Sequence, residues 1–244
     1  MTTSKADYGI DGPAIVRTLI IAGVIAVIAG AVVYGAAIPS GPVARAILSA
    51  LVFFAGICML VKAGLMVRWS KCAKLRERER LIDALELTGG ERVLDVGCGR
   101  GLLLNGAARR LPNGKAFGID LWRDADLSSN SPEAALANAK AENVAERVGI
   151  QTADMRDLPF PGGSVDAVIS SLAIHNIPGR DGRTKVIREI ARVLKPQGRI
   201  ALQDIFATRE YVETLRRLGW KDVKLSAPIF EMLPPLRIVT GRKP

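Results

Sequence analysis

The sequence has few of the residues that build metal sites and disulfide frameworks. It contains three cysteines and one histidine in 244 residues, and no two cysteines form a Cys-x-x-Cys motif. Cys58, Cys72 and Cys98 are therefore expected to be free thiols in a reducing compartment, and no metal site is predicted. Internal repeats and low-complexity tracts are also lacking, so nothing indicates a repeat architecture.

Acidic residues are scarce in the first part of the chain. Only Asp7 and Asp11 carry negative charge before Arg68, whereas the remainder has the charge pattern of an ordinary globular domain. The net charge is +10 and the isoelectric point is about 9.9, which suggests an anionic partner. Acidic lipid and nucleic acid both fit this charge, and the apolar N-terminal region favours lipid.

Two long apolar runs occupy that N-terminal region. Residues 18–38 contain no charged side chain, and residues 46–67 contain only Lys62. Each run reaches the roughly 20 apolar residues that cross the hydrocarbon of a bilayer. Prolines and glycines in residues 38–42 break the helix between the runs. We predict a transmembrane helical hairpin over residues 1–70, with spans at about 18–38 and 46–67.

The charges that flank the two spans predict an orientation. The loop between the spans offers only Arg45, whereas six basic residues follow the second span, namely Arg68, Lys71, Lys74, Arg76, Arg78 and Arg80. By the positive-inside rule this is a multi-pass membrane protein whose C-terminal domain is cytoplasmic. The basic run can also bind acidic lipid headgroups.

Small residues in both spans would permit close helix contact. They are Gly23, Gly30, Ala37, Gly56 and Gly64. Two alternatives to a membrane hairpin are a cleaved signal peptide and a buried helix pair in a soluble dimer.

The rest of the chain alternates short apolar runs with helical patterns. A linking helix is expected within residues 71–90, and a separate domain over residues 91–244. Its predicted strands cover residues 92–96, 115–120, 148–152, 165–171, 199–205, 223–225 and 237–240. This alternation predicts an α/β fold with a mostly parallel sheet and helices on both faces. Ligands of such sheets bind at the carboxyl ends of the strands.

The strongest local signal is a glycine-rich turn after the first of these strands. Gly97, Gly99 and Gly101 allow a ligand to approach the backbone at the start of a helix. The dinucleotide fingerprint would place its third glycine at Leu102, so NAD or FAD binding is disfavoured. Asp120 ends the next strand, where a carboxylate can accept hydrogen bonds from ribose hydroxyls.

Residues 91–244 resemble the class I, Rossmann-like methyltransferases of the type 11 group, which use S-adenosylmethionine (SAM). The resemblance is carried by LDVGCGRG, GIDLW, ADMRDLPFPGGSVDAVISS and REIARVLKPQGRIAL. It implies a seven-stranded sheet whose last strand is antiparallel. It also implies that Asp95 and the glycines Gly97, Gly99 and Gly101 surround the methionine part of SAM, and that Asp120 holds the ribose.

The same resemblance implies contacts with the other parts of the cofactor. The residues implied for the adenine are Leu121 or Trp122, Asp154 and Met155. Ser170 and Ser171, which end the fourth strand, would border the methyl sulfonium.

His175 is the only candidate for a histidine base. It follows the fourth strand, where this group of enzymes often meets its substrate, and an imidazole titrates near neutral pH. The alternative is that His175 only ties its loop to nearby backbone.

The expected function is a membrane-anchored methyltransferase that moves a methyl group from SAM to a small or lipophilic acceptor, such as a lipid, quinone, phenol or thiol. The apolar residues 226–235 are expected to line the acceptor pocket, to touch the bilayer or simply to pack on the last helix. The alternatives are a nucleic-acid methyltransferase, for which the Asp/Asn-Pro-Pro-Tyr-like motif is missing, and a SAM-binding protein without catalysis. The sequence leaves the acceptor, its attacking atom and the oligomeric state open.

Overall fold

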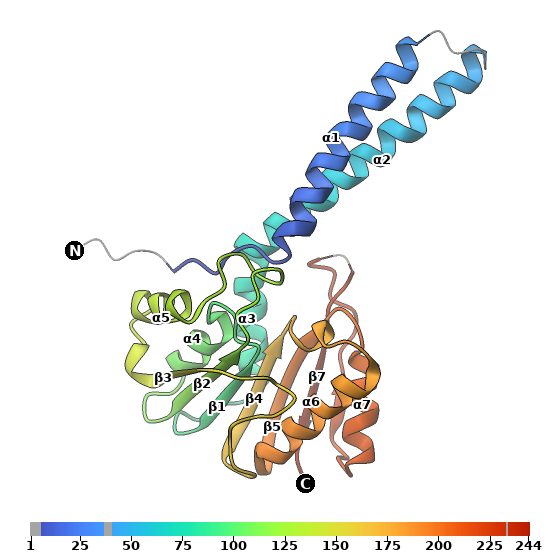
Figure 1. The fold of residues 1–244 in the computed structure, drawn as a ribbon. Coiled ribbons are helices and arrows are strands. Elements are labelled where there is room, and N and C mark those ends of the chain that lie inside the picture. Colours follow the sequence, from blue (N-terminus) through green and yellow to red (C-terminus); the bar gives the residue numbers. More distant parts are fainter. Residues whose placement is uncertain (1–5, 37–40, 233) are drawn as a thin grey trace.

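The computed structural model describes residues 6–36, 41–232 and 234–244, and its main body is a seven-stranded sheet (Figure 1). The strands run in the order β3-β2-β1-β4-β5-β7-β6, and chain order reverses between β1 and β4. Their bounds are β1 Arg92–Val96, β2 Lys115–Asp120, β3 Val148–Thr152, β4 Val165–Ser171, β5 Leu194–Asp204, β6 Val223–Leu225 and β7 Arg237–Arg242. Strands β1 to β5 are parallel, and β7 pairs antiparallel with both β5 and β6. The predicted mostly parallel sheet is confirmed, and it has the Rossmann-like methyltransferase arrangement.

Helices cover both faces of this sheet because its strands are apolar on both sides. One face packs against α3 (Lys74–Asp83), α4 (Leu102–Arg109) and α5 (Pro132–Ala141). The other face packs against α6 (Arg180–Val193) and α7 (Thr208–Arg217). Alternate residues of one strand point into the hydrophobic clusters on opposite faces of the sheet, so that Val93 packs on the side of α4 and Leu94 on the side of α6. Single-turn helices η2 (Ala145–Arg147) and η3 (Ile174–Asn176) complete the domain.

Two element boundaries differ from the prediction. Strand β5 begins at Leu194, not at Arg199, because Leu194 already pairs with Val165 before the register shifts. Strand β7 ends at Arg242 and not at residue 240, because Gly241 and Arg242 still pair with Ile200 and Arg199 of β5.

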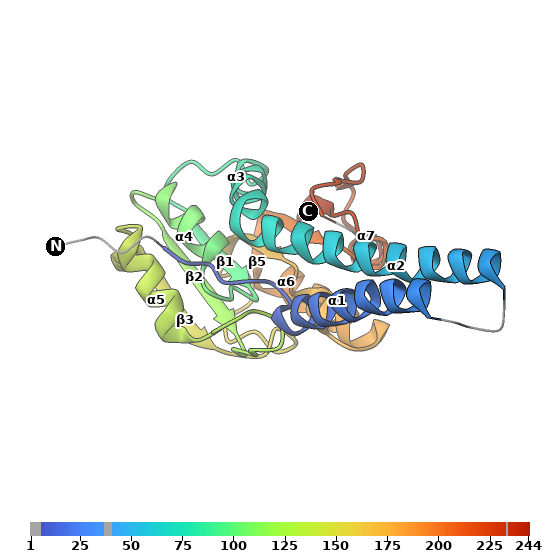
Figure 2. The same ribbon diagram turned by 90° about the horizontal axis from the view of Figure 1, so that it is seen from above.

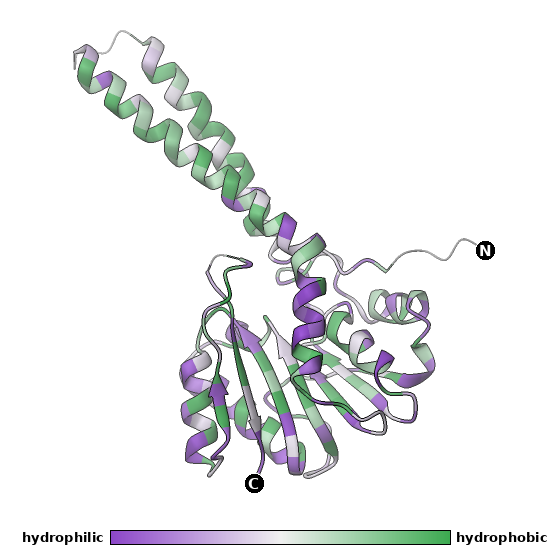
Figure 3. Ribbon diagram, turned by 180° about the vertical axis from the view of Figure 1, so that it is seen from behind, coloured by the Kyte–Doolittle hydropathy of each residue, from purple (hydrophilic) through white to green (hydrophobic). Residues whose placement is uncertain are grey.

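The N-terminal region forms a helical hairpin of α1 (Pro13–Gly35) and α2 (Pro42–Arg68), which projects away from the sheet (Figures 1 and 2). Both helices are long and apolar enough to cross a membrane, and only 17% and 11% of their most apolar windows are buried. Figure 3 shows that the apolar residues continue along both arms of the hairpin. The predicted end of the first span, residues 37 and 38, lies outside the described residues.

Three of the predicted small residues make the contact between the two helices. A Cβ on Gly56 would lie 2.8 Å from the Gly23 carbonyl oxygen, and one on Gly30 would lie 3.0 Å from Phe53. The Ser49 hydroxyl donates a hydrogen bond of 2.7 Å to the Gly30 carbonyl oxygen. The prediction was wrong for Gly64, which has nothing within 4 Å, while Ala37 lies outside the described residues.

The connection from the hairpin to the sheet is also different from the expected single helix over residues 71–87. A π-helical turn, η1 (Trp69–Ala73), joins α2 to α3, and α3 ends at Asp83. Such turns shift the direction of the side chains that follow, and they are frequent at functional sites.

Candidate active site

The turn from β1 into α4 has a conformation that requires glycine. Gly97 and Gly99 have φ values of 77° and 51°, in the region that L-residues rarely adopt. A Cβ on Gly97 would stand 2.3 Å from the Cβ of Ala173, and one on Gly99 would stand 2.9 Å from Leu127. The turn therefore brings bare backbone close to the loop after β4.

Asp120 is fixed at the end of β2 by three hydrogen bonds. One carboxylate oxygen accepts from the Gly99 amide at 2.8 Å. The other accepts from the Trp122 amide at 2.7 Å and from the Asn130 side chain at 3.3 Å. These bonds orient the carboxylate and tie the glycine turn to β2, and the oxygen that accepts only from Gly99 keeps a lone-pair direction for a ligand hydroxyl.

Asp95 is a buried carboxyl group without a partner. It is 1% exposed, and neither of its oxygens has a hydrogen bond among the described residues. Burial raises its pKa to about 8, and the nearby charge of Asp120 adds to this effect. A buried carboxyl of this kind in a cavity wall is suited to a cationic or hydrogen-bond-donating ligand.

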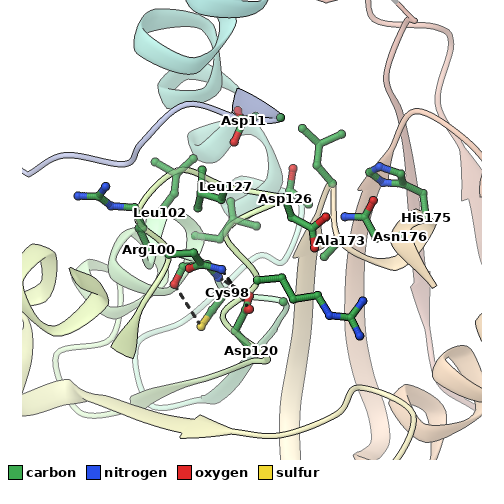
Figure 4. Close-up of a pocket in the computed structure, with 18 of the residues that line it drawn as sticks. Asp11, Cys98, Arg100, Leu102, Asp120, Asp126, Leu127, Ala173, His175 and Asn176 are labelled. Atoms are coloured by element: carbon green, nitrogen blue, oxygen red, sulfur yellow. Dashed lines mark hydrogen bonds between the residues drawn. The ribbon is translucent and has the colours of Figure 1, made fainter. Parts of the chain in front are cut away.

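A cavity of about 280 Å³ joins these groups at the carboxyl ends of β1, β2 and β4 (Figure 4). This is the switch point in strand order, where ligands of such sheets bind. Eight of the predicted site residues line it: Asp95, Gly97, Gly99, Asp120, Leu121, Met155, Ser171 and His175.

Four other predicted site residues do not belong to this cavity wall in the described structure. The Trp122 indole turns aside to donate a 2.8 Å hydrogen bond to Thr152. Asp154 is paired with Arg156 at 2.6 Å, an interaction that lowers the pKa of Asp154. The buried Ser170 hydroxyl donates to the Val96 carbonyl oxygen at 2.7 Å, and Gly101 is the N-cap residue of α4.

His175 lies across the cavity from the glycine turn and next to the buried carboxylate of Asp204. Its Nδ1 lies 2.5 Å from Oδ1 of Asp204, at the end of β5, and its backbone amide donates to the same carboxylate at 3.0 Å. Asp204 is 1% exposed and also accepts a 3.0 Å hydrogen bond from the Tyr211 hydroxyl. Nδ1 makes no hydrogen bond among the described residues, but Asp204 lies close enough to orient the ring as a base while the other ring nitrogen is left for the cavity.

The cavity also has walls that lie outside the methyltransferase-like part of the sequence. Residues 6–12 cross over the carboxyl ends of the strands, and Tyr8, Asp11 and Gly12 line the cavity. Figure 4 shows Asp11 above the glycine turn. The crossing is held by backbone contacts, including hydrogen bonds from the Gly12 amide to Asp126 and from the Lys74 ammonium to Tyr8 and Gly9.

Lys74 corrects the prediction that the whole basic run binds headgroups. Its side chain is buried, and burial lowers its pKa. Arg78 is buried as well and pairs with Glu142 at 3.0 Å. A signal for this was present, because these two residues share a helical stripe with Leu81, and Leu75, expected to be an inward apolar position, is exposed instead.

Among the described residues of the apolar loop 226–235, Met232 lines the cavity. Ile229 packs against the core, whereas Phe230 is 74% exposed. Among the described residues no group of three histidine, cysteine, aspartate or glutamate side chains could hold a metal ion.

Comparison with known proteins relates this site to methyltransferases. Residues 93–198 match the family described as "Methyltransferase domain". Methyltransferase GfsG of Streptomyces halstedii is 35% identical over 130 residues, which are 53% of this chain and 43% of that protein. A demethylmenaquinone methyltransferase of Lactobacillus johnsonii is 28% identical over 157 residues, 64% of this chain and 59% of its own length. The chain thus spans less than two thirds of the curated relatives that it matches.

Solved structures show the same fold. The cyclase SpnF superposes with a TM-score of 0.61 at 20% identity, over 72% of this chain and 83% of the other. A geranyl diphosphate C-methyltransferase of Streptomyces coelicolor superposes with a TM-score of 0.59 at 15% identity, over 75% of this chain and 85% of the other. The chain therefore has the fold of these enzymes, residues 93–198 match a methyltransferase domain, and S-adenosylmethionine is the cofactor that these matches indicate.

Proposed function

We propose that this protein is a membrane-anchored enzyme that transfers the methyl group of SAM to a small lipophilic acceptor. One observation carries the proposal: a single cavity connects the glycine turn and Asp95 with His175 and an apolar wall. Such a cavity offers polar groups for a cofactor next to apolar surface for a second ligand. The names of relatives, which include demethylmenaquinone, rifamycin and sterol methyltransferases, agree with small-molecule acceptors.

The described residues fit SAM in four respects. Gly97 and Gly99 offer bare backbone in the cavity wall, and Asp120 presents an oriented carboxylate for the ribose. The partnerless carboxyl of Asp95 suits the ammonium of the methionine part. Leu121 and Met155 offer apolar surface for the adenine. For Gly101, Trp122, Asp154 and Ser170 the proposed contribution is indirect, through the turn, loop or strand end that each one stabilises.

When bound, SAM supplies an electrophilic methyl group, and the electron pair of the broken carbon–sulfur bond stays on sulfur. The protein's contribution is to hold the acceptor in line with that bond and to exclude water. An acceptor that carries a proton must lose it, and His175 is placed to take it. Asp204 would then stabilise the imidazolium, and Tyr211 would hold Asp204 in place.

The anchor in this proposal is the hairpin. Its outward side chains, such as Ile25 and Phe54, are 61% and 67% exposed, and a bilayer would bury them. The basic residues Arg17, Arg68 and Lys71 lie at the end nearest the domain. We infer a multi-pass topology with the domain on the cytoplasmic side, where SAM is available.

Labelling of a membrane extract tests the function. The full chain in detergent is incubated with methyl-labelled SAM and the extract, and labelled products are separated by polarity. We expect label in the apolar small-molecule fraction, and its loss with Asp120→Ala. Calorimetry that detects no SAM uptake by folded protein would overturn the proposal, and salt-sensitive labelling of RNA would replace it with nucleic-acid methylation.

A further inference from the structure

The apolar end of the cavity is built by the hairpin as well as by the domain. Ile15 of α1, Met66 of α2 and Trp69 of η1 line it, together with Ile205 and Met232. We propose that the base of the hairpin is the acceptor-binding wall, and that its ligand is a membrane-soluble molecule with an apolar body and one hydrogen-bond-accepting oxygen. This inference rests on the proposed function and assigns the hairpin a role in substrate recognition besides anchoring.

The wall is continuous with the loop that carries His175. Trp69 belongs to a buried cluster with Met232, against which Leu172 and Ile205 pack. Leu172 lies three residues before His175 and one before Ala173, the residue in close approach to Gly97. An acceptor lying on Trp69 would therefore extend toward both the oriented base and the glycine turn.

The other hairpin residues converge on the same place. A Cβ on Gly12 would lie 3.5 Å from Ile15 and 3.6 Å from the terminal methyl group of Met66. These two side chains thus close around the start of α1, directly after the segment that crosses the cavity. Of the charged residues in the cavity wall, Lys74 and Asp11 pair with each other at 3.6 Å.

Trp69 offers one polar group to a ligand. The residue is 2% exposed, and its indole N–H has no hydrogen-bond acceptor among the described residues. Buried donors are nearly always paired in folded proteins, and this one belongs to a residue of the cavity wall. A ligand oxygen would supply the acceptor, whereas a thiol or thioether would pair with it only weakly.

The position of the wall along the hairpin points to delivery from the bilayer. Ile15 and Met66 each stand two residues before a basic residue, Arg17 and Arg68. Basic side chains at this place mark the level at which the helices leave the hydrocarbon. Beyond that level both helices carry exposed apolar side chains, so a lipophile could reach the wall without crossing water.

The test uses the full chain in lipid nanodiscs and two probes, a phenol with a long alkyl tail and the same phenol without the tail. In the assayed step the phenol oxygen gains the methyl group of SAM and releases its proton, and S-adenosylhomocysteine is formed. We expect the KM of the tailed phenol to be at least tenfold lower than that of the tail-free one. Trp69→Phe and Met66→Ala should each raise the KM of the tailed phenol at least fivefold and leave that of SAM within twofold.

Matched controls exclude a general effect of these substitutions. Trp220→Phe and Met59→Ala make the same exchanges at residues outside the cavity wall, and both should leave the two KM values unchanged. Unaltered phenol KM values in the Trp69 and Met66 variants would overturn the role of the hairpin. Absence of phenol methylation with intact SAM uptake would overturn the substrate class alone, whereas absence of SAM uptake would overturn the proposed function as well.

Discussion

Asp95→Asn should make the protein more stable and at the same time a poorer binder of SAM. The buried carboxyl has no hydrogen-bond partner among the described residues, and its pKa is raised from 3.8 to about 8. At pH 7 it therefore keeps a proton that the unfolded chain would release. Holding that proton about three pH units above the ordinary pKa costs about 4 kcal/mol, since each unit is worth about 1.4 kcal/mol.

The direction of the pH dependence follows from proton binding. Between about pH 4 and pH 8 the folded protein binds one proton more than the unfolded chain at this position, so the free energy of unfolding falls as pH rises. Asparagine has nearly the same shape and no proton to hold. The free energy of unfolding of Asp95→Asn should thus exceed that of the wild type by nothing near pH 4 and by about 4 kcal/mol at pH 7. The latter difference corresponds to roughly 10 °C in Tm.

Thermal unfolding of wild type and variant, with and without SAM, measures both effects. SAM should raise the Tm of the wild type, and that increase should be lost or much reduced in Asp95→Asn, because a charge-assisted hydrogen bond is worth about 1.5–3 kcal/mol. A variant that is less stable at every pH and keeps the wild-type slope would refute the neutral, buried state of Asp95.

Three further predictions concern the base, the turn and the hairpin. Asp204→Asn should lower kcat at least a hundredfold for a proton-bearing acceptor, because His175 loses its orienting carboxylate, while calorimetry finds the Kd of SAM unchanged. Gly97→Ala should abolish SAM uptake in the same titration, since its Cβ would stand 2.3 Å from that of Ala173; unchanged affinity would contradict the geometry of the turn. Gly56→Ile should separate the two hairpin helices, seen as faster proteolysis in nanodiscs, and equal protease resistance would count against their close contact.

The parts of the fold that sequence could predict depend on local pattern. Strand β1 and the turn after it are read from consecutive residues, because a buried parallel strand is apolar throughout and the turn needs glycine at Gly97 and Gly99. The contact of Gly23 with Gly56 was likewise visible as small residues in two apolar runs.

The parts that sequence could not predict depend on partners distant in the chain. Trp69 reads as the end of a membrane span, and only the fold brings it to Met232 of the last loop. From the sequence alone, Lys74 is interpreted as a solvated basic residue. In the structure residues 6–12 cover it. The sequence does not indicate the role of Asp204, because its contact with His175 joins residues 29 positions apart and appears only in the fold.

The segment of residues 6–12 has a consequence for how the protein is made. The Asp7 amide donates to Asn138, whose side chain donates back to the Asp7 carbonyl oxygen, across 131 positions of sequence. Both hairpin helices leave the ribosome before any strand does, so this segment must wait unpaired until α5 has been synthesised. Residues 6–12 are thus translated before α5 and cannot dock until it exists, and a bulky tag fused ahead of them would hinder this docking.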